Sequence, residues 1–222
     1  MDIKFKKYAL KNGIKVMIIP LDTKLTHISA NFLLGFNHES KEILELTHYY
    51  EHLLGRLTSK KFKSSQKVSN EISRRGGITN AYVNSYEMSV YISGLYNDLE
   101  YYMDILSNSI NNFYIDKSIA KKEKNAVVQE LNNNIAEVEY DFDNKIFKYF
   151  HPKYYYMRDL KHHIKTVRTF TLSHVKKFIK NKVCSKDMVL SITCPSNKVR
   201  ETKNNIDKYF GKIKRNNKCK NI

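Results

Sequence analysis

Short stretches of alternating or continuous apolar residues, separated by turn-forming residues, recur along the chain and indicate β-strands. The first two stretches flank Lys11, Asn12 and Gly13, and the Asn-Gly pair favours a tight hairpin turn between them. Later stretches are rich in β-branched and aromatic residues, which pack well on a pleated sheet. The pattern predicts strands over residues 5–10, 14–19, 27–34, 80–83, 87–95 and 187–193.

Other parts of the chain carry apolar residues three and four positions apart, which is the spacing of one face of an α-helix. One such run follows Ser40, a candidate N-cap, and predicts a helix over residues 41–57. The longest predicted helix covers residues 116–149, with room for a bend, and ends before His151 and Pro152. The spacing also predicts helices over residues 65–75, 98–113, 161–168, 173–182 and 196–209.

No repeat or linker interrupts this order of elements. We therefore expect an α+β fold with a single domain over residues 1–211, in which helices pack on one face of a mostly antiparallel sheet. Residues 212–222 are basic, and we expect them to form a frayed tail. With 41% hydrophobic and 27% charged residues, the 222-residue chain has the composition of a globular protein.

Composition also bears on location and partners. No apolar run approaches the roughly 20 residues that span a bilayer, so we expect no transmembrane segment. Residues 1–7 lack the apolar core of a signal peptide, and we expect a cytoplasmic protein. The formal net charge of +17 is compatible with nucleic-acid binding, but the lysines are spread over the whole chain and no nucleic-acid-binding motif accompanies them. Their abundance is typical of an AT-rich genome, as in some parasites, endosymbionts and large DNA viruses, and nucleic acid is not the partner we expect.

The predicted helix over 41–57 carries His48, Glu51 and His52, which share one face because they are three and four positions apart. Two imidazoles at this spacing can bind one Zn²⁺, with a carboxylate beside the second imidazole. The order H-x-x-E-H is the inverted form of the zinc-peptidase helix. The alternative is a helix with two ordinary surface histidines.

A catalytic zinc site usually needs a third protein ligand, and the long predicted helix offers two carboxylates. Glu123 and Glu130 are seven positions apart, so they lie on one helix face about 10 Å from each other. The alternative to a role as metal ligand is that Glu123 and Glu130 are ordinary solvent-exposed glutamates. The cysteines, Cys184, Cys194 and Cys219, have no C-x-x-C spacing and do not indicate a thiolate zinc site.

Several stretches, in the same order, resemble the insulinase or pitrilysin-type zinc endopeptidases, which include the mitochondrial processing peptidases. The first is the H-x-x-E-H helix, the second is a Gly-Gly-x-x-Asn-Ala-Tyr strand pair, and the third is the helix with two glutamates. The matching stretches are residues 46–54, 76–82, 87–91, 123–130, 151–152, 187–190 and 208–211. Together they extend over nearly the whole chain.

This resemblance implies a role for each candidate residue. His48, His52 and Glu130 would be the ligands of one Zn²⁺ per chain, and Glu51 would be the general base in peptide-bond hydrolysis. Glu123 would lie in the shell around the ligands. An extended peptide or unfolded protein would bind as an added strand along one predicted strand, at Asn80, Ala81 and Tyr82.

The resemblance also implies a partner, because members of the family usually carry at least two such domains. We expect a homodimer or a second peptidase-like domain on another chain. Two other interpretations stay open. One is a peptidase-fold subunit that binds peptide or a partner chain without cleaving. The other is a relative of S-ribosylhomocysteinase, whose third ligand is a cysteine, although no cysteine follows the motif here until Cys184.

The other histidines do not suggest a second site. We expect His27, His38 and His174 to be structural or exposed. His162 and His163 are adjacent, so on a helix they diverge and are poorly placed to bind one ion together.

Overall fold

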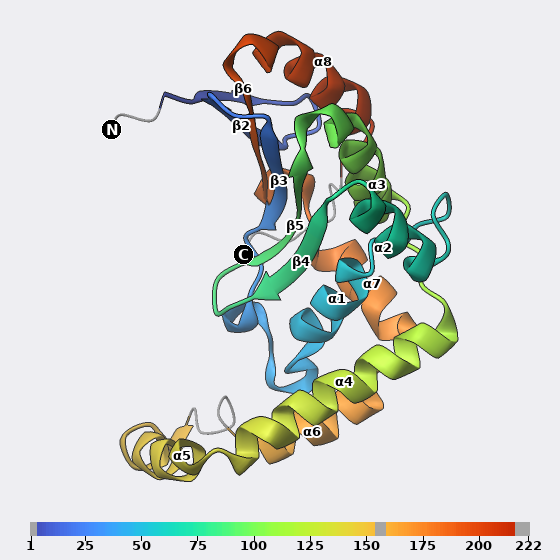
Figure 1. Ribbon diagram of the computed structural model, residues 1–222. Coiled ribbons are helices and arrows are strands. Elements are labelled where there is room, and N and C mark those ends of the chain that lie inside the picture. The colour runs from blue at the N-terminus through green and yellow to red at the C-terminus, as the bar shows by residue number, and fades with distance from the viewer. Residues whose placement is uncertain (1–3, 154–158, 216–222) are drawn as a thin grey trace.

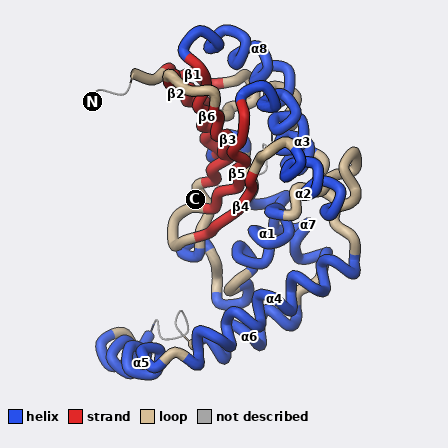
Figure 2. Tube along the Cα trace, in the orientation of Figure 1, coloured by secondary structure: helices blue, strands red, loops and turns tan. Residues whose placement is uncertain are grey.

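The computed structural model of the protein describes residues 4–153 and 159–215, and its centre is a six-stranded sheet (Figures 1 and 2). The strands lie in the order β1-β2-β6-β3-β5-β4. β2 and β6 pair in parallel and the other neighbours pair antiparallel, which confirms the predicted mostly antiparallel sheet. The bounds are Lys6–Ala9 (β1), Lys15–Leu21 (β2), Leu25–Phe32 (β3), Ile78–Val83 (β4), Met88–Leu95 (β5) and Met188–Pro195 (β6).

Helices cover one face of this sheet, and α4 and α6 lie side by side farther from it (Figure 1). α5 continues from the end of α4 and lies away from the sheet (Figure 1). No helix within the described residues is long and apolar enough to cross a membrane. The bounds are Leu46–Gly55 (α1), Ser65–Arg74 (α2), Leu99–Asn111 (α3), Lys117–Ala136 (α4), Val138–Phe150 (α5), Leu160–Thr169 (α6), Leu172–Lys182 (α7) and Val199–Tyr209 (α8).

The predicted helix over 41–57 is wrong at its start, because the chain breaks before α1. Residues 41–43 form one 3₁₀ turn, and Glu45 adopts the left-handed conformation with φ of 71°. The carboxylate of Glu39 accepts the backbone N–H groups of Glu45 and Thr47 at 2.7 and 2.6 Å. This side chain satisfies N–H groups that the first turn of a helix leaves without partners, and it fixes the start of α1 at Leu46.

The predicted helix over 116–149 is two helices, α4 and α5. Glu137 between them is extended, with φ of −66° and ψ of 136°, and this single residue interrupts the helical hydrogen bonds. Asp116 caps the start of α4, where its side chain accepts the N–H of Ser118. The change of direction at Glu137 allows α4 to remain against the body of the protein while α5 leaves it (Figure 1).

The main core lies between the sheet and the helices on its covered face. The central strands β3, β5 and β6 contribute fully buried aliphatic residues such as Ile28, Ile92 and Ile192. α1 contributes Tyr50 and Leu53, both fully buried. α1 is therefore held firmly under the sheet, and its opposite face is free to carry polar groups.

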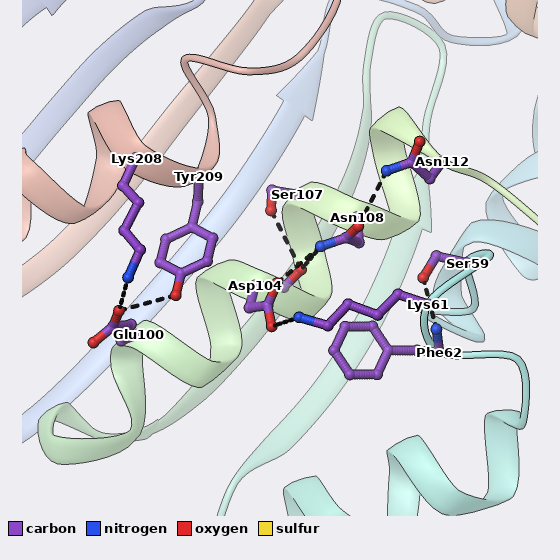
Figure 3. Close-up of polar contacts among 10 residues, drawn as sticks. All are labelled: Ser59, Lys61, Phe62, Glu100, Asp104, Ser107, Asn108, Asn112, Lys208 and Tyr209. Carbon is purple, nitrogen blue, oxygen red and sulfur yellow. Dashed lines mark hydrogen bonds and ion pairs between the residues drawn. The ribbon is translucent and has the colours of Figure 1, made fainter.

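Polar contacts tie α3 to its neighbours at the surface (Figure 3). Glu100 on α3 accepts hydrogen bonds from Lys208 and Tyr209 of α8 at 2.6 and 2.9 Å. Asp104, one turn along the same helix, pairs with Lys61 in the segment that follows α1. These contacts connect the segment between α1 and α2 to α8 through α3.

The C-terminal end of the described chain packs against the predicted N-terminal hairpin turn. The side-chain amide of Asn12 donates to the carbonyls of Phe210 and Ile213 at 2.8 and 2.9 Å, and Ile213 is buried. Residues 216–222 of the predicted tail lie outside the described residues. The boundary between domain and tail remains a prediction.

Candidate metal centre

Three candidate ligands from two helices meet at one point. The Nε2 atom of His48 lies 3.2 Å from one carboxylate oxygen of Glu130, and Nε2 of His52 lies 3.4 Å from the other. One ligand atom of each residue can be chosen such that all lie within 4.8 Å of one another. α1 and α4, which the sequence alone could not place relative to each other, thus present two imidazoles and a carboxylate to a common space.

The packing of α1 explains this arrangement. Apolar residues of α1 face the core, so His48, Glu51 and His52 project from the other side toward α4. The Tyr49 hydroxyl donates to the carbonyl of Ala120 at 2.8 Å and ties the two helices together. The apolar face of α1 therefore determines the position of its polar face.

The Nδ1 atom of His48 faces a buried carboxylate, that of Glu45. One oxygen of Glu45 lies 2.7 Å from Nδ1 of His48, and the other lies 2.8 Å from Nδ1 of His163 on α6. Burial raises the pKa of Glu45, but the hydrogen bonds from His163 and His48 outweigh it and lower the pKa to about 2. Burial lowers the pKa of His48, and the bond to Glu45 reverses this and raises it.

Glu123, predicted to lie around the ligands, contacts the other histidine. Its carboxylate lies 3.4 Å from Nδ1 of His52 and 2.6 Å from the guanidinium of Arg56. Burial raises the pKa of Glu123, and the bonds from His52 and Arg56 overcome this and lower it. Each imidazole of the cluster therefore has its own carboxylate at Nδ1, and its Nε2 atom faces Glu130.

Glu51 lies in the same cluster, with a carboxylate oxygen 3.9 Å from Nε2 of His52. Burial raises the pKa of Glu51, and the neighbouring histidines oppose this rise. A carboxylate held in such surroundings is suited to exchanging a proton.

The cluster opens into a cleft of about 750 Å³. One wall is β4, including Asn80, Ala81 and Tyr82, and β4 is an edge strand of the sheet. α1 approaches β4 closely at Gly55, where an added Cβ would lie 3.3 Å from the Cβ of Ala81. The predicted ligands and the predicted peptide-binding strand thus line one cleft, and their roles remain predictions.

Sequence reasoning missed four residues around the cluster: Glu39, Glu45, Arg56 and His163. Glu45 and Arg56 carry a local signal, since they lie three positions before His48 and four positions after His52. His163 offers no such signal, because it comes from a helix 118 positions away from Glu45. We expected only that the adjacent histidines do not bind one ion together, and this left the contact of His163 with Glu45 unrecognised.

Comparisons with known proteins give relatives among the zinc proteases and processing peptidases. Zinc protease YmxG of Bacillus subtilis is 28% identical over 127 residues, which are 57% of this chain and 31% of that protein. The β subunit of the mitochondrial-processing peptidase of Neurospora crassa is 26% identical over 218 residues, 95% of this chain and 44% of that protein. This chain thus spans less than half the length of either relative.

A solved structure of pitrilysin has the same fold, with a TM-score of 0.83 and 19% identity over 99% of this chain and 24% of that one. The fold prediction is therefore confirmed. The insulinase family, peptidase family M16, matches residues 26–166, from β3 into α6. This match includes α1 and α4, which carry the cluster, and β4, which forms one wall of the cleft. The chain belongs to the insulinase family of peptidases.

Proposed function

We propose that this chain is the metal-bearing domain of a zinc-dependent endopeptidase that cleaves extended peptides. The observation that carries the proposal is the convergence of His48, His52 and Glu130 beside an open strand edge. Membership of the insulinase family supports it, as do the relatives named as zinc protease and processing peptidase.

The donor set fits zinc. Catalytic zinc sites commonly use three protein ligands, and two histidines with one glutamate are a known combination. Because carboxylates occupy Nδ1 of both imidazoles, the Nε2 lone pairs are available on the side of Glu130. Zinc, when bound, would lower the pKa of a bound water and polarise a peptide carbonyl. We expect one zinc per chain, held by these three residues.

Glu51 has the position of a general base in this proposal. Its carboxylate shares the face of α1 with both imidazoles and lines the cleft. It can therefore accept a proton from a water that attacks a peptide carbonyl, and later return that proton to the leaving amine. Nearby Glu123 is paired with Arg56 and His52, which leaves Glu51 the better placed carboxylate for this task.

The substrate would bind along β4. β4 pairs with β5 on one side, and within the described residues its other edge has no strand partner. An extended peptide can pair with such an edge through main-chain hydrogen bonds, which are common to all sequences. Asn80, Ala81 and Tyr82 would then hold the peptide next to the cluster, with broad tolerance for its sequence.

A second domain would complete the enzyme. The cleft is open, and the side chains of Glu130 and Arg56 are each 49% exposed. Enclosing a site strengthens the electrostatic interactions within it and excludes water. Because this chain spans less than half of its relatives, we propose that a second peptidase-like domain, either a second copy or a separate chain, covers the cleft.

The test is the Glu51→Gln variant, assayed for zinc content and for cleavage of unstructured peptides. We expect it to keep one zinc per chain and to lose at least about 100-fold in cleavage rate, the scale of a positioned general base. Glu139→Gln, which changes an exposed carboxylate on α5, is the matched control. Near wild-type cleavage by Glu51→Gln would remove Glu51 from the mechanism. Wild-type protein that binds zinc and peptide but never cleaves, with or without a second domain, would favour the non-cleaving subunit.

A further inference from the structure

Glu45 has an unusual backbone conformation for its residue type. It adopts φ of 71°, and Leu57 is the other non-glycine residue with positive φ within the described chain. Side chains with a Cβ rarely adopt this conformation, and it persists where the surroundings hold it in place. Here the Glu39 carboxylate accepts the N–H of Glu45 at 2.7 Å. A position that glycine would fill without strain therefore carries a carboxylate.

The carboxylate of Glu45 is buried, and each of its oxygens has a hydrogen-bond partner. Glu45 is 6% exposed and His163 is 5% exposed. The Oε2 atom of Glu45 lies 2.7 Å from Nδ1 of His48, and Oε1 lies 2.8 Å from Nδ1 of His163. A buried carboxylate needs such partners, and in this case one of them is a candidate metal ligand.

The contact has a chemical consequence for His48. A carboxylate at Nδ1 favours the tautomer in which Nδ1 carries the proton, so the lone pair of Nε2 stays free for a metal. The same bond fixes the orientation of the ring and increases the basicity of its free nitrogen. His163 donates to the second oxygen and prevents the carboxylate from rotating away from His48.

We propose that Glu45 is a positioning residue for the metal ligand His48, and that His163 on α6 anchors Glu45. The proposal rests on the zinc site of the proposed function. It makes metal affinity depend on α6, which contributes none of the three proposed ligands. His52 has a similar arrangement, in which Glu123 contacts the ring and Arg56 pairs with Glu123. Arg56 is partly exposed, whereas Glu45 and His163 are both buried.

The competing explanation is that the pair only joins α1 to α6 as a structural contact. Four variants separate the two explanations. Glu45→Gly removes the carboxylate and also relieves the backbone, which offsets part of the cost of losing the buried contact with His163. Glu45→Gln keeps the size of the side chain but cannot accept from both imidazoles. His163→Leu removes the anchoring donor, and His163→Asn keeps an N–H donor near the position of Nδ1.

The experiment measures zinc affinity of the full chain by competition with a chelator, together with the visible spectrum of the Co²⁺-loaded protein. We expect Glu45→Gly, Glu45→Gln and His163→Leu to weaken zinc binding by about 10- to 100-fold, the scale known for such partners of metal ligands. His163→Asn should stay within about threefold of wild type. The Co²⁺ spectrum should change in the first three variants, because the orientation of His48 changes.

Thermal unfolding of the metal-free variants separates positioning from folding. Glu45→Gly should remain folded without metal while its zinc affinity falls, and exposed His151→Gln should change neither the melting temperature nor the zinc affinity. Folded variants of Glu45 and His163 that bind zinc as tightly as wild type would overturn the positioning role alone. Wild-type protein that takes up no zinc would overturn the proposed function and this inference together.

Discussion

Two consecutive helices of this protein, α4 and α5, have opposite surroundings. α4 packs against α1 and α6, and its apolar residues Val127 and Leu131 are buried. A single residue separates α5 from α4, and α5 exposes apolar side chains that repeat three and four positions apart along one face. These residues, which we call the α5 apolar face, are Val138, Phe142, Ile146, Tyr149 and Phe150.

The difference shows which part of the structure the chain completes by itself. α4 is packed against α1 and α6 of this chain and carries the candidate ligand Glu130. The α5 apolar face is left uncovered by the described residues, and exposed apolar patches of this kind commonly mark interaction surfaces. If the second peptidase-like domain of the proposed function binds at this face, changes to the face should alter assembly and leave the fold of the isolated chain intact.

The largest expected effect concerns the ligand on α4. Glu130→Gln replaces an anionic ligand by a neutral amide, and we expect zinc affinity to fall by more than about 100-fold, beyond the effect of losing an indirect partner. Since metal binding is coupled to folding, zinc should also raise the melting temperature much less in this variant. Chelator competition and thermal unfolding measure both effects. Unchanged zinc affinity would remove Glu130 from the site.

A matched pair of truncations tests the comparison of the two helices directly. Leu131→Ala in α4 leaves a cavity in the core, and we expect it to lower the free energy of unfolding by about 3 kcal/mol. Phe142→Ala in α5 removes a side chain that is 66% exposed, and we expect a change below about 0.5 kcal/mol. Urea unfolding of the isolated chain gives both values. If Phe142→Ala lowers the free energy of unfolding as much as Leu131→Ala does, α5 is packed in solution.

Cleavage by the isolated chain tests the need for a second domain. We expect the monomer, held at high dilution, to cleave an unstructured peptide library slowly per bound zinc, because its cleft is open to water. Assembly with a second domain should increase the rate, and Phe142→Glu should oppose that increase by placing a charge on the α5 apolar face. A monomer as fast as any assembled form would show that this domain is sufficient.

A further effect, confined to the pH dependence of stability, concerns the buried carboxylate that caps α1. Burial raises the pKa of Glu39 to about 7 from an ordinary value of 4.5, against the opposing hydrogen bonds from Thr47 and Glu45. Between these pH values the folded state keeps a proton that the unfolded state releases, so the free energy of unfolding falls as the pH rises. Glu39→Gln should remove this part of the pH dependence in urea unfolding of the metal-free protein. If the free energy of unfolding of Glu39→Gln varies with pH as it does in the wild type, the raised pKa of Glu39 is contradicted.

The sequence could predict features that depend on residues close together in the chain. It could not predict features that depend on contacts between distant segments. The face shared by His48, Glu51 and His52 follows from helical spacing alone. The start of α1 does not, because apolar spacing continues back to Ile43, whereas the left-handed Glu45 and its contact with Glu39 interrupt the helix. Apolar spacing likewise continues across Glu137, so the sequence allowed a bend in the long helix without locating the break.

Long-range arrangements were beyond the sequence. The pattern predicted a strand over 187–193, but its insertion between β2 and β3 depends on packing across the whole sheet. The pair of Glu45 and His163 likewise joins segments that share no local pattern. The prediction that Glu130 joins His48 and His52 as a ligand came from a family resemblance. Helical spacing alone cannot place α4 relative to α1.

The central claim is that this chain holds a single zinc ion at the meeting point of α1 and α4. Native mass spectrometry of the purified chain, with zinc titrated into wild type and Glu130→Gln, tests it most directly because it gives metal stoichiometry and oligomeric mass together. We predict one tightly bound zinc per wild-type chain and none retained by Glu130→Gln. A wild-type chain that remains free of zinc throughout the titration would contradict the claim.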